Sequence, residues 1–148
     1  MAYIGYCGDD CEQCPRYIAT KSNDREKLKE AAVLWQKVGL REIIAKPEEM
    51  ICHGCASLET CHYNDIRECA KDKEIDNCGK CMEYPCNKIN AVFEKTGSYA
   101  QQCKEACTAS DYERLNKAFF LKKERLDAVH LKHTSVDKKT AVMGFLKN

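Results

Sequence analysis

The sequence has no apolar stretch long enough to cross a membrane. Its longest apolar runs are only a few residues, whereas a membrane-spanning helix needs about 20. The segment from Met1 to Cys7 also lacks the basic head and apolar stretch of a secretory signal. We therefore expect a soluble, cytoplasmic protein without a membrane partner.

Several motifs of catalytic and nucleotide-binding proteins are missing as well. The chain has no glycine-rich phosphate-binding loop, no G-x-S-x-G turn and no H-E-x-x-H helix. No pair of carboxylates stands apart from the general charge of the sequence. These absences leave an enzymatic role open, but they favour a protein that is not an enzyme.

The strong basic footprint of many nucleic-acid-binding proteins is absent overall, since the formal net charge is only +1. From Ala109 onward, however, nine Lys and Arg residues stand against five Asp and Glu residues. A solvated helix face explains the basic stretch from Arg114 to Lys147 better than phosphate contacts do. Nucleic acid is therefore a possible but weakly supported partner.

Cysteine is the residue type in excess, with twelve in 148 residues. In a short secreted chain this number suggests disulfides, whereas the reducing cytosol makes metal binding or redox use the better interpretation. Ten of the twelve lie between Cys7 and Cys86, and none follows Cys107. Because the chain lacks a secretory signal, metal binding is favoured.

The ten front cysteines fall into groups with the spacing of metal ligands. Two cysteines separated by two residues can direct both sulfurs at one ion, because the chain reverses in a tight turn. Glycine helps such a turn adopt the required φ angle, and Gly54 and Gly79 occupy these positions. We predict zinc as the metal, with ligands drawn from Cys7, Cys11, Cys14, Cys52, Cys55, Cys61, Cys69, Cys78, Cys81 and Cys86.

The spacing leaves open how these cysteines divide between one and two ions. In the simplest arrangement, the pair at 52 and 55 and the pair at 78 and 81 share one tetrahedral site of four thiolates. The cluster that begins at Cys7 then needs a fourth ligand, for which Cys69 and Cys86 are the candidates. Crossed pairings fit equally well, and Cys61 is the weakest member of the set.

Other chemistry could use the same sulfurs. Thiolate sets bind iron as well as zinc, so an iron–sulfur redox protein is the main alternative. The first three cysteines have the spacing of the cluster loop in radical S-adenosylmethionine enzymes, but the chain is too short and too poor in strands for their barrel. A dithiol redox turn at Cys78 and Cys81, with Lys80 lowering a thiol pKa, lacks its usual βαβ context.

The histidines are not assigned as ligands. His53 and His62 lie among the cysteines and could substitute as ligands or donate hydrogen bonds to them, although there are enough cysteines to fill the sites. His130 and His133 lie in a lysine-rich stretch, where we predict surface positions.

Apolar spacing predicts helices along most of the chain. One is expected between the caps Ser22–Asp24 and Gly39, with Trp35 on its buried face. Shorter helices are expected from about Asp65 and from Pro85 to Gly97. The longest should run from about residue 110 to 133, followed by a short segment capped at 137. No alternating run is strong enough to predict a strand.

The expected fold is therefore a mostly α, small cysteine-rich domain, stabilised by metal and packed on a long C-terminal helix. We take residues 1–148 as a single domain, in which 1–97 form the cysteine-rich metal-binding part and 98–148 the helical C-terminal part. Cys103 and Cys107 share one face of a predicted helix, where packing is at least as good an explanation as metal binding.

Seven short motifs occur together along the front of the chain. They are Tyr6-Cys7-Gly8, Asp10-Cys11, Cys14-Pro15, Tyr17-Ile18-Ala19-Thr20, Cys52-x-Gly54-Cys55, Ile66-Arg67-x-Cys69-Ala70 and Cys78-x-x-Cys81-x-x-Tyr84-Pro85-Cys86. In this combination the sequence resembles an uncharacterised bacterial and archaeal family, domain of unknown function 3795, over roughly residues 6–93. Two departures stand out, because relatives tend to carry Leu in place of Asp9 and another cysteine in place of Asp65. The resemblance supports the cysteine framework and implies no reaction.

These observations predict a small cytosolic zinc-binding protein with one or two ions. Its expected role is that of a structural or interaction module for an unidentified protein partner. An iron–sulfur redox protein and a nucleic-acid-binding zinc protein are the alternatives.

Overall fold

The computed structural model of the protein describes residues 4–54 and 63–146, with side chains as far as residue 135. In this part of the chain the structure is mostly helical, and an isolated bridge between Ile4 and Asp10 is the only β pairing. The elements in chain order are η1 (Cys11–Gln13), α1 (Pro15–Lys21), α2 (Arg25–Lys37), η2 (Pro47–Met50), α3 (Asn64–Asp72), η3 (Cys78–Lys80), α4 (Asn87–Ala106), α5 (Ala109–Leu115), η4 (Asn116–Phe120) and α6 (Lys122–Leu146).

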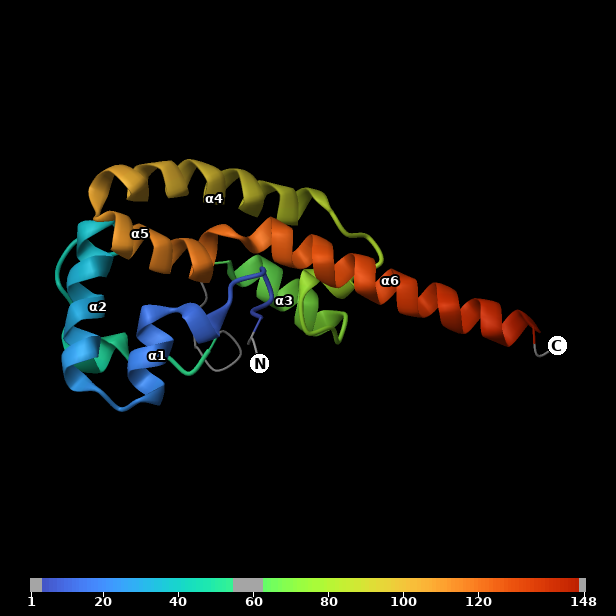
Figure 1. The fold of residues 1–148 in the computed structure, drawn as a ribbon, viewed down its shortest axis with the longest axis horizontal. Coiled ribbons are helices and arrows are strands. Elements are labelled where there is room, and N and C mark those ends of the chain that lie inside the picture. The colour runs from blue at the N-terminus through green and yellow to red at the C-terminus, as the bar shows by residue number, and fades with distance from the viewer. Residues whose placement is uncertain (1–3, 55–62, 147–148) are drawn as a thin grey trace.

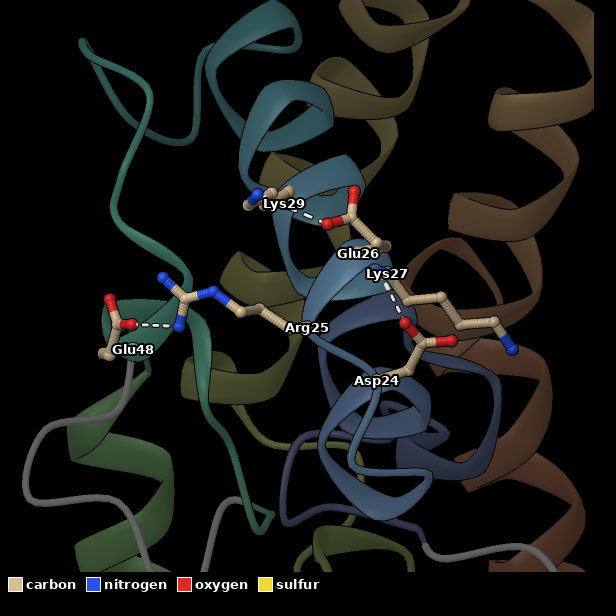
Figure 2. A network of polar contacts seen from close by, with 6 residues as sticks. All are labelled: Asp24, Arg25, Glu26, Lys27, Lys29 and Glu48. Carbon is tan, nitrogen blue, oxygen red and sulfur yellow. Dashed lines mark hydrogen bonds and ion pairs between the residues drawn. The ribbon is translucent and has the colours of Figure 1, made fainter.

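Helix α2 forms where the apolar spacing predicts it. The Asp24 side chain caps it by accepting a 3.1 Å hydrogen bond from the Lys27 backbone N–H. Next to this cap, Arg25 pairs with Glu48 of η2, which ties the start of the helix to a segment 23 residues away (Figure 2). The face predicted to be buried is buried, and it consists of Leu28, Ala31, Ala32, Trp35 and Val38.

Helix α4 is longer than the sequence predicts. The expected end at Gly97 is wrong, because α4 continues through this glycine to Ala106. Gly97 is exposed, and a Cβ atom added there would meet nothing within 4 Å. An exposed glycine inside a helix costs only about 1 kcal/mol, and packing on both sides of it keeps the helix continuous.

The predicted long helix over 110–133 is also interrupted. It is divided into α5, the π-helical segment η4 and α6. Helix α6 then continues to Leu146 without the separate segment that we expected to begin at Asp137. In Figure 1, α4 lies alongside α5 and the start of α6, whereas the C-terminal part of α6 extends away from the body. None of the helices in the described ranges combines the length and apolar character needed to cross a bilayer.

Two hydrophobic clusters hold these helices together. The first joins α1, α2, η2, the C-terminal half of α4, α5 and η4, with Trp35 and Cys103 among its buried members. The second joins the segment around Cys7 with α3, η3, the N-terminal half of α4 and α6, with Ile66, Ile89 and Leu126 among its members. Each cluster takes residues from both sides of position 97, so the cysteine-rich front is packed on α5, η4 and α6.

The N-terminal segment lies directly on η4 and α6. The Asp10 N–H donates a 2.9 Å hydrogen bond to the Ala118 carbonyl, and Asp9 pairs with the buried Lys122 at 2.6 Å. Gly8 has a φ angle of +100°, and a Cβ atom there would lie 2.8 Å from the Lys122 carbonyl oxygen. The glycine beside Cys7 is therefore required both by its backbone conformation and by the close approach of α6.

Candidate metal centre

Four cysteines from three elements line one small cavity. Cys69 comes from α3, Cys78 and Cys81 lie at either end of the η3 turn, and Cys86 immediately precedes α4. The cavity has a volume of about 20 Å³, which is room for one occupant of the size of a water molecule. We call these four residues the α3–α4 cysteine cluster.

The η3 turn presents its two cysteines through local hydrogen bonds. The Asn77 side chain accepts a 2.9 Å hydrogen bond from the Gly79 N–H, and the Cys81 N–H donates to the Cys78 carbonyl at 3.1 Å. The Glu83 N–H then points at the Cys81 sulfur, 3.4 Å away. One backbone N–H of this turn therefore faces a sulfur, where it would stabilise negative charge on a thiolate.

Helix α6 supports the same turn from outside the cluster. The Gly79 carbonyl lies 2.9 Å from Nδ1 of His130, and the Tyr84 hydroxyl donates a 2.6 Å hydrogen bond to Asp127. A Cβ atom on Gly79 would lie 2.9 Å from the Leu126 carbonyl oxygen and from Val129. The sequence predicts that Gly79 is needed for an unusual φ angle. In the structure Gly79 is needed instead for close packing on α6. Gly54 does have a positive φ, of 104°.

The electrostatics of the cluster depend on its occupant. Burial raises the pKa of Cys78 to about 12, and the neighbouring Cys86, Cys69 and Cys81 add to the rise, against a smaller lowering by Lys73. Without a cation, Cys78 is therefore a neutral thiol at pH 7. The Lys73 ammonium lies 3.2 Å from the Cys81 sulfur, where it would offset part of the charge of a thiolate.

The donor set of the cluster suits a soft metal ion, since four sulfurs are the ligands of structural zinc sites. In the described part of the chain, however, no three cysteine, histidine or acidic side chains already have the arrangement of a metal site. The residues therefore fit the metal by chemistry, and binding requires the sulfurs to move closer around the ion.

A second group of cysteines lines a larger cavity, of about 560 Å³. Arg16 accounts for the position of Cys52 in this group. Its guanidinium donates to the Met50 carbonyl at 2.9 Å and to the carbonyls on either side of it at 3.3 Å. The Cys52 N–H also donates to the Thr20 hydroxyl at 2.9 Å, so this segment is tied to α1. The cysteines of the group are Cys7, Cys11, Cys14 and Cys52.

Cys14 of this second group is a buried thiol. Burial raises its pKa to about 12, with smaller contributions from Cys52 and Asp9. Backbone N–H groups of Arg16 and Tyr17, at the start of α1, oppose the rise but do not overcome it. Cys14 is therefore a neutral thiol at pH 7 unless a cation is bound beside it.

The predicted ligands thus fall into two groups, but not in the simplest predicted arrangement. Cys52 lies with Cys14, whereas Cys78 and Cys81 share their cavity with Cys69 and Cys86. In the described residues Cys52 thus lies apart from Cys78 and Cys81, a grouping that matches the crossed pairings that the spacing left open. Cys55, Cys61 and His62 lie outside the described residues.

Sequence reasoning missed two residues that contact the α3–α4 cysteine cluster or its η3 turn. Lys73, rather than Lys80, lies beside a sulfur, since Lys80 pairs with Asp76 at 2.6 Å. His130 is half-buried, with its ring 5.0 Å from that of Tyr84, so its predicted surface position is wrong. The contact of His130 with the η3 turn is seen only in the packing of α6 on η3.

The two remaining cysteines lie apart from both groups. Cys103 is completely buried in the first hydrophobic cluster. The sulfur of the half-buried Cys107 contacts the Cys103 carbonyl oxygen at 3.1 Å. Both positions agree with packing on the C-terminal half of α4.

Comparison with known proteins places this framework in a family. A family model described as Protein of unknown function (DUF3795) matches residues 3–91, which include both cysteine groups. The chain belongs to this family. No curated protein and no solved structure matches it. The DUF3795 region ends inside α4, so the C-terminal half of α4, with α5, η4 and α6, lies beyond the matched residues.

Proposed function

We propose that this DUF3795 protein binds zinc, and that Cys69, Cys78, Cys81 and Cys86 hold the ion. One observation carries the proposal, namely that four cysteines from three separate elements line one cavity of about 20 Å³. Apolar residues such as Ile66 and Ile89 line the same cavity, but four sulfurs around one ion-sized space are the donor set of a structural zinc site. Their neighbours Lys73 and the Glu83 N–H supply positive charge and a hydrogen bond to sulfur.

The chemistry of this set is that of a structural ion. Four thiolates occupy all the tetrahedral positions of zinc, at about 2.3 Å each, and leave none open for substrate. The ion would join α3, the η3 turn and the start of α4, which are otherwise connected by short loops. Closed zinc sites contribute on the order of 10 kcal/mol at neutral pH, so removal of the ion should unfold this part of the chain.

A second ion is proposed for the other group, where Cys11, Cys14 and Cys52 supply sulfur ligands and Cys7 lines the same cavity. The same thiolates could hold an iron–sulfur cluster instead. The metal content of protein purified without air distinguishes these possibilities, since iron gives a coloured protein and zinc a colourless one.

We propose further that the protein acts in the cytoplasm as an interaction module. Four large aliphatic residues on the segment after α2 are exposed, and Ile43 is exposed to 75%. Exposed apolar groups of this kind favour a protein partner over nucleic acid. The four residues are Leu40, Ile43, Ile44 and Ile51.

Titration of the reduced, metal-free chain with Co²⁺, a spectroscopic substitute for Zn²⁺, tests the site. We expect the visible absorption of Co²⁺ in tetrahedral thiolate coordination. In Cys69→Ser we expect this absorption to decrease by the share that the α3–α4 cysteine cluster contributes. Absorption that is the same in Cys69→Ser and in the unaltered chain would contradict the proposal.

A further inference from the structure

The larger cavity, which the second cysteine group lines in part, has the size and lining of a small-molecule binding site. Its volume of about 560 Å³ is in the range of small-molecule sites, which are typically 300–1,000 Å³ and lined mainly by aromatic and apolar side chains. Trp35 and Phe119 meet edge to face at 5.9 Å, and Tyr99 and Phe120 do so at 6.1 Å. The aromatic residues that line it are Tyr17, Trp35, Tyr63, Tyr99, Phe119 and Phe120.

A buried hydroxyl group in the cavity lacks a hydrogen-bond partner. Thr96 on α4 is only 7% exposed, and its hydroxyl has no hydrogen-bond partner in the described structure. A buried hydroxyl without a partner is destabilising. Since Thr96 lines the cavity, a bound molecule with a polar group could supply the missing hydrogen bond.

Among the described residues, three basic side chains and one acidic side chain, Asp9, line the cavity. Arg16 is already used on backbone carbonyls, and Lys122 is paired with Asp9. Lys95, next to Thr96 on α4, also lines the cavity and is exposed. This leaves Lys95 as the charge available to an incoming ligand.

We propose that this cavity binds a flat aromatic molecule that carries one anionic group. The ring system lies between the aromatic side chains of α2, α4 and η4, the anionic group meets Lys95, and a polar atom meets the Thr96 hydroxyl. The proposal does not depend on zinc at the α3–α4 cysteine cluster, which lines a different cavity. It shares its cavity with the second ion proposed at Cys11, Cys14 and Cys52, so binding is measured with and without bound metal.

A matched pair of fluorescent probes tests the proposal. 8-Anilinonaphthalene-1-sulfonate has the proposed chemistry, whereas N-phenyl-1-naphthylamine has the same rings without the anionic group. Trp35 is the only tryptophan in the chain and lines the cavity, so energy transfer from it shows that the probe binds in the neighbourhood of the cavity. We expect saturable binding of one sulfonate per chain, at least about fivefold tighter than the neutral probe at low salt. Equal affinity for the two probes, or no transfer from Trp35, would overturn the proposal.

Four variants separate specific binding from a loosely folded chain. Lys95→Gln should remove most of the preference for the sulfonate, whereas Lys104→Gln, on the same helix but outside the cavity lining, should keep it. Thr96→Val should raise the melting temperature, because it removes an unpartnered hydroxyl, and yet weaken sulfonate binding by about threefold to tenfold. Thr96→Met should fill the space and abolish binding.

Near-ultraviolet circular dichroism and zinc content are measured on each sample. Because some unfolded states also bind the sulfonate, binding counts as support only where the spectrum is native. Unchanged binding in natively folded Thr96→Val and Lys95→Gln would contradict the proposal. A natively folded chain that binds the sulfonate as expected but contains no zinc would contradict only the proposed zinc site.

Discussion

The ammonium of Lys73 lies 3.2 Å from the sulfur of Cys81 and 2.8 Å from a carboxylate oxygen of Glu83. The cation thus joins a cysteine of the α3–α4 cluster to an acidic side chain on the solvent side. A zinc ion with four thiolates carries a net charge of −2, and this lysine is placed to offset part of it.

Replacing Lys73 by Met should therefore weaken zinc binding without removing a ligand. Changes to groups that hydrogen-bond a metal ligand typically cost 10- to 100-fold in affinity. Because Lys73 is partly exposed and screened by solvent, we expect about tenfold. Competition with a chromogenic chelator measures the affinity. Lys80→Met is the matched control, since Lys80 pairs with Asp76 instead, and equal effects of the two variants would contradict the assigned role.

Two glycines test whether α6 supports the η3 turn. In Gly79→Ala the new methyl group would lie 2.9 Å from the Leu126 carbonyl oxygen, and such overpacking costs about 1–3 kcal/mol. In Gly97→Ala the methyl group meets nothing within 4 Å, and the higher helix propensity of alanine should stabilise the chain by up to about 1 kcal/mol. Urea denaturation of both variants should give shifts of opposite sign. Shifts of the same sign would mean that the close contact with α6 is not maintained.

Tyr99 predicts how stability changes at alkaline pH. Its hydroxyl donates a 2.9 Å hydrogen bond to the Val38 carbonyl, and its pKa is raised by burial first and by Cys103 second. A raised pKa in the folded chain means that the contribution to stability is complete below about pH 10, the ordinary value for tyrosine. It is lost as the pH rises further, because only the unfolded chain then ionises.

We therefore expect Tyr99→Phe to be about 1 kcal/mol less stable than the unaltered chain at pH 8. The difference should shrink between pH 9 and pH 11, as measured by urea denaturation at several pH values. A difference that stays constant or grows over this range would contradict the assigned hydrogen bond and its pKa.

The local features of the fold could be predicted from the sequence. The buried face of α2 follows from apolar spacing and its start from the Asp24 cap, because both depend on neighbouring residues. The end of α4 could not be predicted in this way. Gly97 is a helix-ending residue by propensity, but the contacts that keep α4 continuous come from residues distant in the sequence.

The same distinction holds for the candidate site. Spacing identified the cysteine turns, since each turn is local, but it could not show which turns meet. Cys52 joins Cys14 because Arg16 holds the carbonyls of residues more than 30 positions away. The crossed grouping is thus a consequence of helix packing. The roles of Lys73 and His130 arise in the same way, from the contacts of α3 and α6 with the η3 turn.

The central claim is that four sulfurs of the α3–α4 cysteine cluster share one zinc ion. Native mass spectrometry with elemental analysis, on protein purified without air, tests it most directly. We predict at least one zinc per chain, one fewer in Cys78→Ser, and an unchanged number in Cys107→Ser, whose sulfur lies outside both groups. A Cys78→Ser chain that keeps its full zinc content, or an unaltered chain that contains no zinc, would contradict the account.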